Sequence, residues 1–390
     1  MTPAARVQAS IEILDDILAG MPVEKALTGW ARRSRFAGSK DRAAVRDHVF
    51  DAVRCKRSFA ALGGANTGRG LMIGAVRAEQ GNLEALFSGD RHAPSPVLEA
   101  ETTRDFTSDA ERFDIPEWLW PRFSASLGGE AIPAAQSLQT RAAVHLRVNL
   151  LKGDVATVLL ALEDDNIKAL PHPACDTALE VTEGARKISQ SRAYANGLVE
   201  LQDAASQAVV AALDLKPGMR VLDYCAGGGG KALALAAHKG LEVFAHDVNA
   251  GRMRDLPVRA ARAGAKITML TTDEIADVAP FDVVLVDAPC SGSGSWRRAP
   301  AGKWALTDER LQDLTAIQTR ILTQIVSLVG AHGTLAYATC SMLNDENGTV
   351  VDRFLERNPK WRESFRRSWL VTHGTDGFFT AHLTREPSGD

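Results

Sequence analysis

Apolar residues recur at three- and four-residue intervals along the first sixty residues, a spacing that places them on one face of a helix. One series follows Thr2 and Pro3, which suit a helix start, and comprises Val7, Ile11, Leu14 and Leu18. A second runs through SKDRAAVRDHVFDAVR at Val45, Val49 and Val53. We therefore predict an all-α domain over residues 1–125.

The pattern changes at VHLRVNLL (144–151), which predicts a strand. A helix candidate, VATVLLALEDD, and a further strand, LVELQD (198–203), follow it, so we predict a small α/β connector over residues 126–200. From residue 201 to 390, strand candidates such as FDVVLV and TLAYAT alternate with helix candidates. The longest helix candidate carries Leu311, Leu314, Ile317, Ile321 and Ile325 on one side. This order predicts a multidomain chain that ends in a Rossmann-like α/β domain with a parallel sheet.

Composition narrows the class of protein without naming a function. Of 390 residues, 45% are hydrophobic and the net charge is −3, so total charge does not indicate a nucleic-acid binder. The chain has five cysteines, an odd number, and no two of them are spaced as CxxC. This argues against a disulfide framework or a zinc ribbon. No stretch approaches the roughly 18 consecutive apolar residues of a membrane span, and the start does not resemble a signal peptide. We expect a cytoplasmic protein with no membrane partner.

The stretch DYCAGGGGK follows the first strand of the α/β domain and is a candidate cofactor loop. A phosphate-binding P-loop is excluded because positions 225 and 232 are Cys and Ala. The dinucleotide pattern GxGxxG/A fits loosely through Gly227, Gly229 and Ala232. We take as candidate cofactor residues Cys225, Ala226, Gly227, Gly228, Gly229, Gly230 and Lys231.

Two aspartates follow the next strands. Asp247 stands twenty residues after Gly227, where a carboxylate can accept hydrogen bonds from the ribose of NAD or of S-adenosylmethionine. Asp273, after the third strand, is placed to reach an adenine edge. The alternative for both is that they only cap loops or helix starts.

Three cysteines, Cys225, Cys290 and Cys340, fall at the carboxyl ends of predicted strands, where ligands bind in open α/β sheets. A solitary cysteine is usually a small buried hydrophobic residue, but three in such positions weaken that interpretation. A three-cysteine metal site would lack a nearby histidine or fourth ligand, so we expect no metal.

The motifs DAPCSGSG, ATCS and CAGGGGK together resemble the Sun/Nop family of RNA (cytosine-5)-methyltransferases. The resemblance spans roughly residues 144–383 and includes LRVN, LQDAASQ, the RR…KW segment, YATCSMLNDEN and DGFFTAHL. It implies a class I methyltransferase domain that uses S-adenosylmethionine. ALTGWARRSRFAGSKDRAAVRDHVFDAVR resembles the NusB-like helical domain fused to bacterial members, a domain type that binds RNA.

The resemblance also implies a role for each site residue. Cys340 would add to cytosine carbon-6, which activates carbon-5 toward the methyl donor, and Cys290 would assist release of the adduct. Asp287 would bond ring nitrogen-3 and the exocyclic amine, and also lie beside the cofactor. Lys231 would neutralise and orient groups near the cofactor and Asp287, while Cys225 packs beside the cofactor. Family members commonly have Ala-Pro-Gly-Gly-Lys where this chain has Gly227–Lys231, and the loss of the proline predicts a more flexible loop around the methionine end of the cofactor.

Basic residues supply candidate RNA contacts. Residues 32–57 hold nine Lys/Arg against three Asp, and the candidates there are Arg32, Arg33, Arg35, Lys40 and Arg42. The alternative is a solvated helix face. Arg147 in LRVN matches a family position near the substrate. Trp296, Arg297 and Arg298 follow the DAPC loop and are candidates to stack on or steer a nucleotide, with a packed loop aromatic as the alternative for Trp296.

Three other functions fit parts of the sequence. An NAD-linked oxidoreductase explains the glycine loop but neither DAPC nor ATCS. A DNA cytosine methyltransferase would use the PCS-type cysteine as nucleophile, and a catalytically weak RNA-binding ribosome-assembly factor would not need both cysteines. Ribosomal RNA is the favoured substrate, tRNA remains open, and a monomer is expected although the sequence does not decide oligomeric state.

Overall fold

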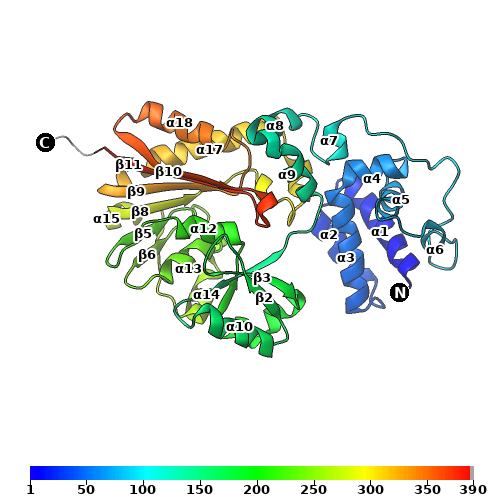
Figure 1. Ribbon diagram of the computed structural model, residues 1–390, viewed down its shortest axis with the longest axis horizontal. Coiled ribbons are helices and arrows are strands. Elements are labelled where there is room, and N and C mark those ends of the chain that lie inside the picture. The colour runs from blue at the N-terminus through cyan, green and yellow to red at the C-terminus, as the bar shows by residue number, and fades with distance from the viewer. Residues whose placement is uncertain (387–390) are drawn as a thin grey trace. The chain divides into compact units, whose positions relative to one another are not determined.

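The computed structural model describes residues 1–386, which form two compact units. The first comprises Met1–Arg141 together with Trp296–Ala305, and the second comprises Ala142–Ser295 and the residues from Leu306 onward. Figure 1 shows the elements of both along the chain. Among the residues described, no helix has the length and apolar character needed to cross a membrane.

The first unit is entirely helical, as predicted. Its helix α1 begins where Thr2 Oγ1 accepts a 3.1 Å hydrogen bond from the Ala5 amide, and Val7, Ile11 and Leu14 are buried on one face. Its helices are α1 (Pro3–Leu18), α2 (Val23–Arg33), α3 (Ser39–Arg54), α4 (Lys56–Gly63), α5 (Gly68–Ala78), α6 (Leu83–Leu86), α7 (Asp109–Arg112), α8 (Trp120–Leu127), α9 (Ala131–Leu138) and α16 (Ala301–Ala305).

Helix α16 belongs to this unit although it begins 163 residues after the end of α9. The Lys303 ammonium donates a 3.0 Å hydrogen bond to the Arg54 carbonyl, and the Trp304 indole donates one of 2.6 Å to the Val53 carbonyl. Both acceptors lie in the last turn of α3, whose carbonyls have no partner within the helix. The sequence pattern instead predicts this segment within the α/β domain, and it ends the helical domain at residue 125, which lies inside α8.

The second unit contains a four-stranded antiparallel sheet in the order β2-β3-β1-β4. It corresponds to the predicted connector and confirms the strand expected at VHLRV. Its elements are β1 (Val144–Val148), α10 (Val155–Asp164), β2 (Lys168–Pro171), β3 (Ala178–Glu183), α11 (Arg192–Ala195) and β4 (Val199–Leu201).

The same unit contains a seven-stranded sheet in the order β10-β11-β9-β8-β5-β6-β7. Its strands are β5 (Arg220–Asp223), β6 (Glu242–Ala245), β7 (Thr268–Met269), β8 (Phe281–Asp287), β9 (Val329–Thr339), β10 (Trp361–Trp369) and β11 (Phe378–Arg385). Strands β5 to β9 pair in parallel, as the alternating pattern predicted. Strands β10 and β11 are antiparallel, so the prediction of a parallel sheet is wrong at this edge. The two end strands form a hairpin, which has no crossover helix to impose parallel pairing.

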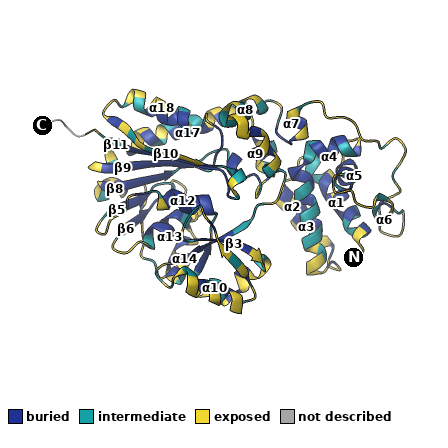
Figure 2. Ribbon diagram, in the orientation of Figure 1, coloured by how far each residue is buried: buried dark blue, intermediate teal, exposed yellow. Residues whose placement is uncertain are grey.

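Helices cover both faces of the seven-stranded sheet: α12 (Ala204–Ala211), α13 (Gly230–Ala236), α14 (Leu256–Ala263), α15 (Ile275–Val278), α17 (Asp308–Ile325) and α18 (Gly348–Arg357). Alternate residues of β8 point to opposite faces. Val283 and Leu285 pack with α12 and α13, whereas Val284 and Val286 pack with α17 and α18. Figure 2 shows the resulting buried strands beneath helices with exposed outer faces.

Helix α17 differs from its predicted buried face in two positions. Leu311, Leu314 and Ile325 are buried as expected, but the other buried positions are Gln318 and Leu322, and Ile317 and Ile321 are only half-buried. Gln318 is tolerated in the core because its amide donates to the Pro289 carbonyl at 2.9 Å and to Glu346 Oε1 at 3.1 Å.

The close crossing of α4 and α5 generates a stability prediction. A Cβ added at Gly74 would lie 1.9 Å from the Phe59 carbonyl oxygen, a backbone atom that cannot move aside locally. We expect Gly74→Ala to destabilise the helical unit by about 1–3 kcal/mol or more through overpacking. Differential scanning calorimetry should show its unfolding transition shifted to lower temperature.

Gly129→Ala is the matched control, because a Cβ there meets nothing within 4 Å. An equal effect of the two substitutions would contradict the packing argument.

Candidate active site

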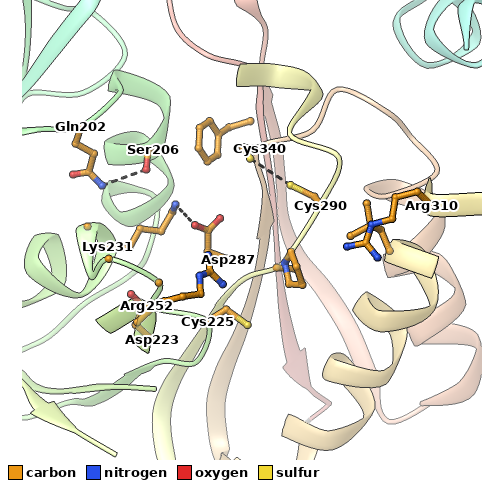
Figure 3. Close-up of a pocket in the computed structure, with 18 residues that line it drawn as sticks. Gln202, Ser206, Asp223, Cys225, Lys231, Arg252, Asp287, Cys290, Arg310 and Cys340 are labelled. Carbon is orange, nitrogen blue, oxygen red and sulfur yellow. Dashed lines mark hydrogen bonds and ion pairs between the residues drawn. The ribbon is translucent and has the colours of Figure 1, made fainter. Parts of the chain in front are cut away.

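A pocket of about 520 Å³ opens where β5, β8 and β9 end. Figure 3 shows the side chains that converge on it. The structure brings into this one pocket residues that the sequence singled out separately, namely Cys225, Ala226, Gly227, Gly228, Gly230, Lys231, Asp287, Cys290 and Cys340. It also adds residues that sequence reasoning missed, including Gln202, Ser206, Asp223, Arg252, Arg310, Leu314 and Phe378.

The two thiols of the pocket are direct neighbours. Cys290 Sγ lies 3.3 Å from Cys340 Sγ, as the dashed line in Figure 3 marks. Parallel pairing of β8 with β9 sets Asp287 opposite Ala338, so both cysteines emerge from the same sheet edge. A single ligand at this edge can therefore contact both sulfur atoms.

A buried carboxylate fixes the loops that carry the thiols. Glu346 is fully buried and accepts hydrogen bonds from the amide and hydroxyl of Ser291, at 2.8 and 2.5 Å, and from the Ser341 hydroxyl at 2.6 Å. Each of these serines directly follows one of the cysteines. Burial raises the pKa of Glu346, and the serine hydrogen bonds oppose that shift. Glu346 is a positioning residue to which the sequence analysis assigned no role. The signals for it were its place in the motif YATCSMLNDEN and the repeated Cys-Ser pair.

Two of the three thiols of the pocket, Cys290 and Cys225, have raised pKa values. The hydrogen bond with Cys340, and after it burial, raise the pKa of Cys290 well above its usual range, which favours the protonated thiol at this position. Burial and the nearby Asp223 raise the pKa of Cys225 strongly. Cys225 is therefore an inert thiol of the pocket wall, since the thiolate is the reactive form.

Lys231 and Asp287 form an ion pair inside the pocket, with Lys231 Nζ 2.7 Å from Asp287 Oδ2. Burial lowers the pKa of Lys231, but the charge of Asp287 and the hydrogen bond to it outweigh burial and raise the pKa overall. The Lys231 side chain is only 6% exposed, and its ammonium lies 4.9 Å from the centre of the Phe378 ring. The lysine stays protonated and holds the aspartate in one position.

Asp223, the last residue of β5, is a second carboxylate in the pocket. It is completely buried, and neither carboxylate oxygen has a hydrogen-bond partner. Burial, and after it the charge of Asp287, raise the pKa of Asp223 to about 7. An unpaired buried carboxylate is costly, so this position favours a ligand that brings positive charge or hydrogen-bond donors.

The glycine loop lines the pocket with its backbone, and a side chain at Gly229 would collide with a neighbouring helix. Gly229 has φ +79°, and a Cβ there would lie 2.3 Å from Leu256 Cδ1. The Gly227 amide donates a 2.9 Å hydrogen bond to Asp247 Oδ2, and the Arg252 guanidinium lies 3.1 Å from the same oxygen. Gly229 and Asp247 thus shape the loop from behind and lie outside the pocket lining.

The other sequence-predicted residues fall elsewhere. Asp273 is exposed and does not line the pocket. Arg147 was expected near RNA, but it is buried and donates to the Gly230 carbonyl at 2.7 Å and to Gln202 Oε1. Burial lowers the pKa of Arg147 to about 10. Arg147 therefore supports the glycine loop, and its buried side chain is not accessible to a nucleic acid.

The segment after the DAPC loop also differs from expectation. Trp296 is 2% exposed, so its ring has no free face for stacking on a nucleotide and matches the packed alternative. Arg297 is half-buried, donates to the Arg141 carbonyl at 2.8 Å, and belongs with Trp296 and Arg298 to the helical unit.

The five basic residues predicted to contact RNA near the start of the chain are all exposed. They lie at the end of α2, in the following loop and at the start of α3: Arg32, Arg33, Arg35, Lys40 and Arg42.

Comparisons with known proteins agree with this architecture. Residues 210–384 match the protein-family model described as 16S rRNA methyltransferase RsmB/F, and residues 115–187 match that of the RsmF/B-like ferredoxin-like domain. The chain is 33% identical to ribosomal RNA small subunit methyltransferase B of Salmonella arizonae over 292 residues. This aligned stretch covers 73% of this chain and 68% of the relative.

Two solved structures share the fold. The crystal structure of PH0851 superposes with a TM-score of 0.76 and 24% identity over 99% of each chain. NSun6 from Pyrococcus horikoshii, in a structure with SFG, has a TM-score of 0.61 and 18% identity over 69% of this chain and 98% of that one.

The isolation of Asp223 predicts how stability depends on pH. Its folded pKa of about 7 exceeds the unfolded value of about 3.9, so the folded state binds more protons between these values and loses stability as pH rises through them. We expect Asp223→Asn to gain stability relative to the parent between pH 4.5 and pH 8, by up to about 4 kcal/mol. Thermal unfolding of the two proteins, measured across this pH range, tests the prediction.

The exposed Asp313→Asn is the control and should show no such trend. A stability difference for Asp223→Asn that stays constant with pH would refute the argument.

Proposed function

This chain belongs to the 16S rRNA methyltransferase RsmB/F family, and from that premise we propose that it transfers a methyl group from S-adenosylmethionine to carbon-5 of a cytosine in ribosomal RNA. The observation that carries the proposal is the pair of adjacent thiols beside the Lys231–Asp287 ion pair in one pocket. Neither hydride transfer nor phosphate chemistry needs two cysteines at the ends of neighbouring strands. A reaction in which one thiol adds to a pyrimidine ring and the other assists its later elimination uses both cysteines.

The pocket residues fit S-adenosylmethionine. The buried Asp223, whose carboxylate has no hydrogen-bond partner, suits the ammonium group or sulfonium of its methionine end. The glycine backbone at Gly228 and Gly230, which line the pocket, permits close approach. Asp247 would hold the ribose if the Arg252 side chain, which is 58% exposed, gave up its ion pair. Asp273 would meet the adenine edge from outside the present pocket lining. When bound, the cofactor supplies an electrophilic methyl group.

The side chains of the chain divide the remaining work. Cys340 is the proposed nucleophile: its thiolate adds to carbon-6, and the charge of Lys231 acts on this thiolate. Asp287 accepts a hydrogen bond from the exocyclic amine of the cytosine, and Lys231 keeps that carboxylate oriented. In the release step the carbon-5 proton passes to water, the electrons of that C–H bond re-form the carbon-5–carbon-6 double bond, and Cys340 leaves as a thiolate. The Cys290 thiol, whose pKa is raised, lies 3.3 Å from that sulfur and donates a hydrogen bond to it.

For the rest of the chain we propose a division of labour by domain. The helical unit resembles a NusB-like RNA-binding domain in the region that holds the exposed basic set. Phe36, 77% exposed, stands directly after Arg35 and offers a ring for an unpaired base. The four-stranded sheet then serves as a connector before the catalytic domain, whose target base must be unpaired or flipped out.

Separate substitution of the two cysteines tests the mechanism. Cys340→Ala should reduce methyl transfer to 16S rRNA by at least 10³-fold, because the carbon-6 adduct cannot form. Cys290→Ala should leave addition intact and slow release, so that RNA stays attached to the protein on a denaturing gel. Bisulfite sequencing of rRNA and tRNA identifies the methylated cytosine.

Cys175→Ala provides the control, since that thiol is half-buried and lies outside the pocket lining. Full activity of Cys340→Ala, or no RNA adduct with Cys290→Ala, would overturn the assignment of the respective residue.

The basic set predicts salt-dependent RNA binding. Replacing Arg32, Arg33 and Arg35 together by Gln should weaken RNA binding and lower the slope of log Kd against log salt by about 2–3, because each arginine that binds a phosphate adds roughly one to that slope. Filter binding of rRNA fragments at several salt concentrations measures both quantities.

A variant that removes three exposed charges from the other unit, Arg353→Gln with Arg357→Gln and Lys360→Gln, controls for net charge. If both triple variants change the slope equally, the helical unit is not the phosphate-binding element.

A further inference from the structure

Three metal-ligating side chains meet at one end of the four-stranded sheet. His145 on β1 pairs directly across the sheet with Glu180 on β3, so the two side chains share a face. His172 comes immediately after β2, which ends at Pro171. One ligating atom from each of the three residues lies within 4.8 Å of the other two.

The ring of His145 is oriented for ligation. Its side chain is completely buried, and Nδ1 lies 2.9 Å from Asp203 Oδ2. An ionised carboxylate only accepts hydrogen bonds, so this 2.9 Å contact favours the proton on Nδ1 over the 3.4 Å contact of the Ala204 amide with the same nitrogen, and it leaves Nε2 as the ligating atom. Nε2 is buried and has no hydrogen-bond partner. An unpaired buried ring nitrogen is unfavourable, and a metal ion would satisfy it.

The other two residues complete the set. His172 is 7% exposed, and its ring centre lies 4.9 Å from that of His145. Its Nδ1 accepts only a long hydrogen bond, 3.2 Å, from the Ala174 amide, a bond that it can exchange for a metal. Glu180 is half-buried, so its carboxylate can shift toward an ion without leaving a deep core position.

We propose that His145, His172 and Glu180 bind one divalent transition-metal ion, with Zn²⁺ as the expected occupant. Two imidazoles and a carboxylate are a common zinc ligand set, and three protein ligands leave a position for water. Zinc–ligand distances of about 2.0–2.2 Å require the three atoms to move closer together by side-chain rotation. Asp203 holds the outer nitrogen of His145, the arrangement in which a carboxylate fixes the tautomer of a metal-binding histidine.

The site would join distant parts of the second unit. Asp203 also caps α12, where its Oδ1 accepts from the Ala205 amide at 2.8 Å, and its Oδ2 accepts from the Asp376 amide at 3.1 Å. Helix α12 and the strand after Asp376 contribute Ser206 and Phe378 to the catalytic pocket. A bound ion therefore stabilises the connection between the small sheet and the pocket walls, and the proposal does not depend on the methyl-transfer reaction.

The thiols of the active site are the competing zinc ligands in this chain, because Cys290 and Cys340 lie side by side. Cobalt distinguishes the two sites: thiolate ligands give intense charge-transfer absorption in the near ultraviolet, whereas nitrogen and oxygen ligands do not. The Co²⁺ spectrum of the unaltered chain thus reports the ligand type without any substitution.

The experiment titrates the full chain with Zn²⁺ against a chromophoric chelator and measures bound metal by mass spectrometry after gel filtration. We expect one zinc per chain, a rise in unfolding temperature on binding, and a Co²⁺ complex without thiolate absorption. His145→Gln and Glu180→Gln should each weaken binding at least tenfold, whereas the exposed His332→Gln should bind like the parent. Absence of bound zinc, thiolate absorption as the sole Co²⁺ signal, or equal binding by all three variants would overturn the proposal.

Discussion

The parallel pairing of β8 with β9 is the constraint on which the site depends. It sets Asp287 opposite Ala338, and the chain then leaves both strands at the same edge toward Cys290 and Cys340. Because side chains alternate along a strand, a slip of one residue would turn the apolar faces of β8 toward the wrong helices. The core on both faces of the sheet therefore fixes the register, and the register fixes the separation of the two sulfur atoms.

Polar contacts convert this register into a defined site. Glu346 bonds the serine after each cysteine, so the two loops cannot drift apart without leaving a buried carboxylate unsatisfied. Gly294 contributes to the same arrangement: its amide donates to the Cys340 carbonyl at 3.0 Å, and its own carbonyl accepts from Gly377 at 2.9 Å. A Cβ at Gly294 would lie 1.9 Å from the Gly377 oxygen, which explains why this position needs glycine.

Charge is distributed unevenly around the pocket. Lys231 is paired with Asp287, but Asp223 lies buried nearby without a partner. The pocket wall therefore holds a carboxylate whose burial the charge of Lys231 offsets only in part, an arrangement that disfavours the ligand-free state and favours a cationic ligand. The buried carboxylate thus lowers the stability of the ligand-free protein and strengthens ligand binding, a trade-off that is common at functional sites.

The sequence by itself determined the class of each element and the chemistry at the strand ends. Continuous apolar runs predicted β8 and β9, and helical spacing predicted α1, because these patterns follow from local geometry. The motifs also identified Lys231, Asp287, Cys290 and Cys340 as one group. They left undetected the antiparallel hairpin β10–β11 and the buried role of Gln318, since both depend on which partners arrive from elsewhere.

Only the tertiary structure decided distances and burial. The two sulfur atoms are 50 residues apart in sequence, Lys231 and Asp287 are 56 apart, and Lys303 bonds a carbonyl 249 residues away. Local pattern carries no information about such contacts, so it could not show that Arg147 supports the glycine loop, that Trp296 is packed in the helical unit, or that Asp223 lacks a partner. The same holds for His145, His172 and Glu180, which strand pairing brings together from three separate stretches of the chain.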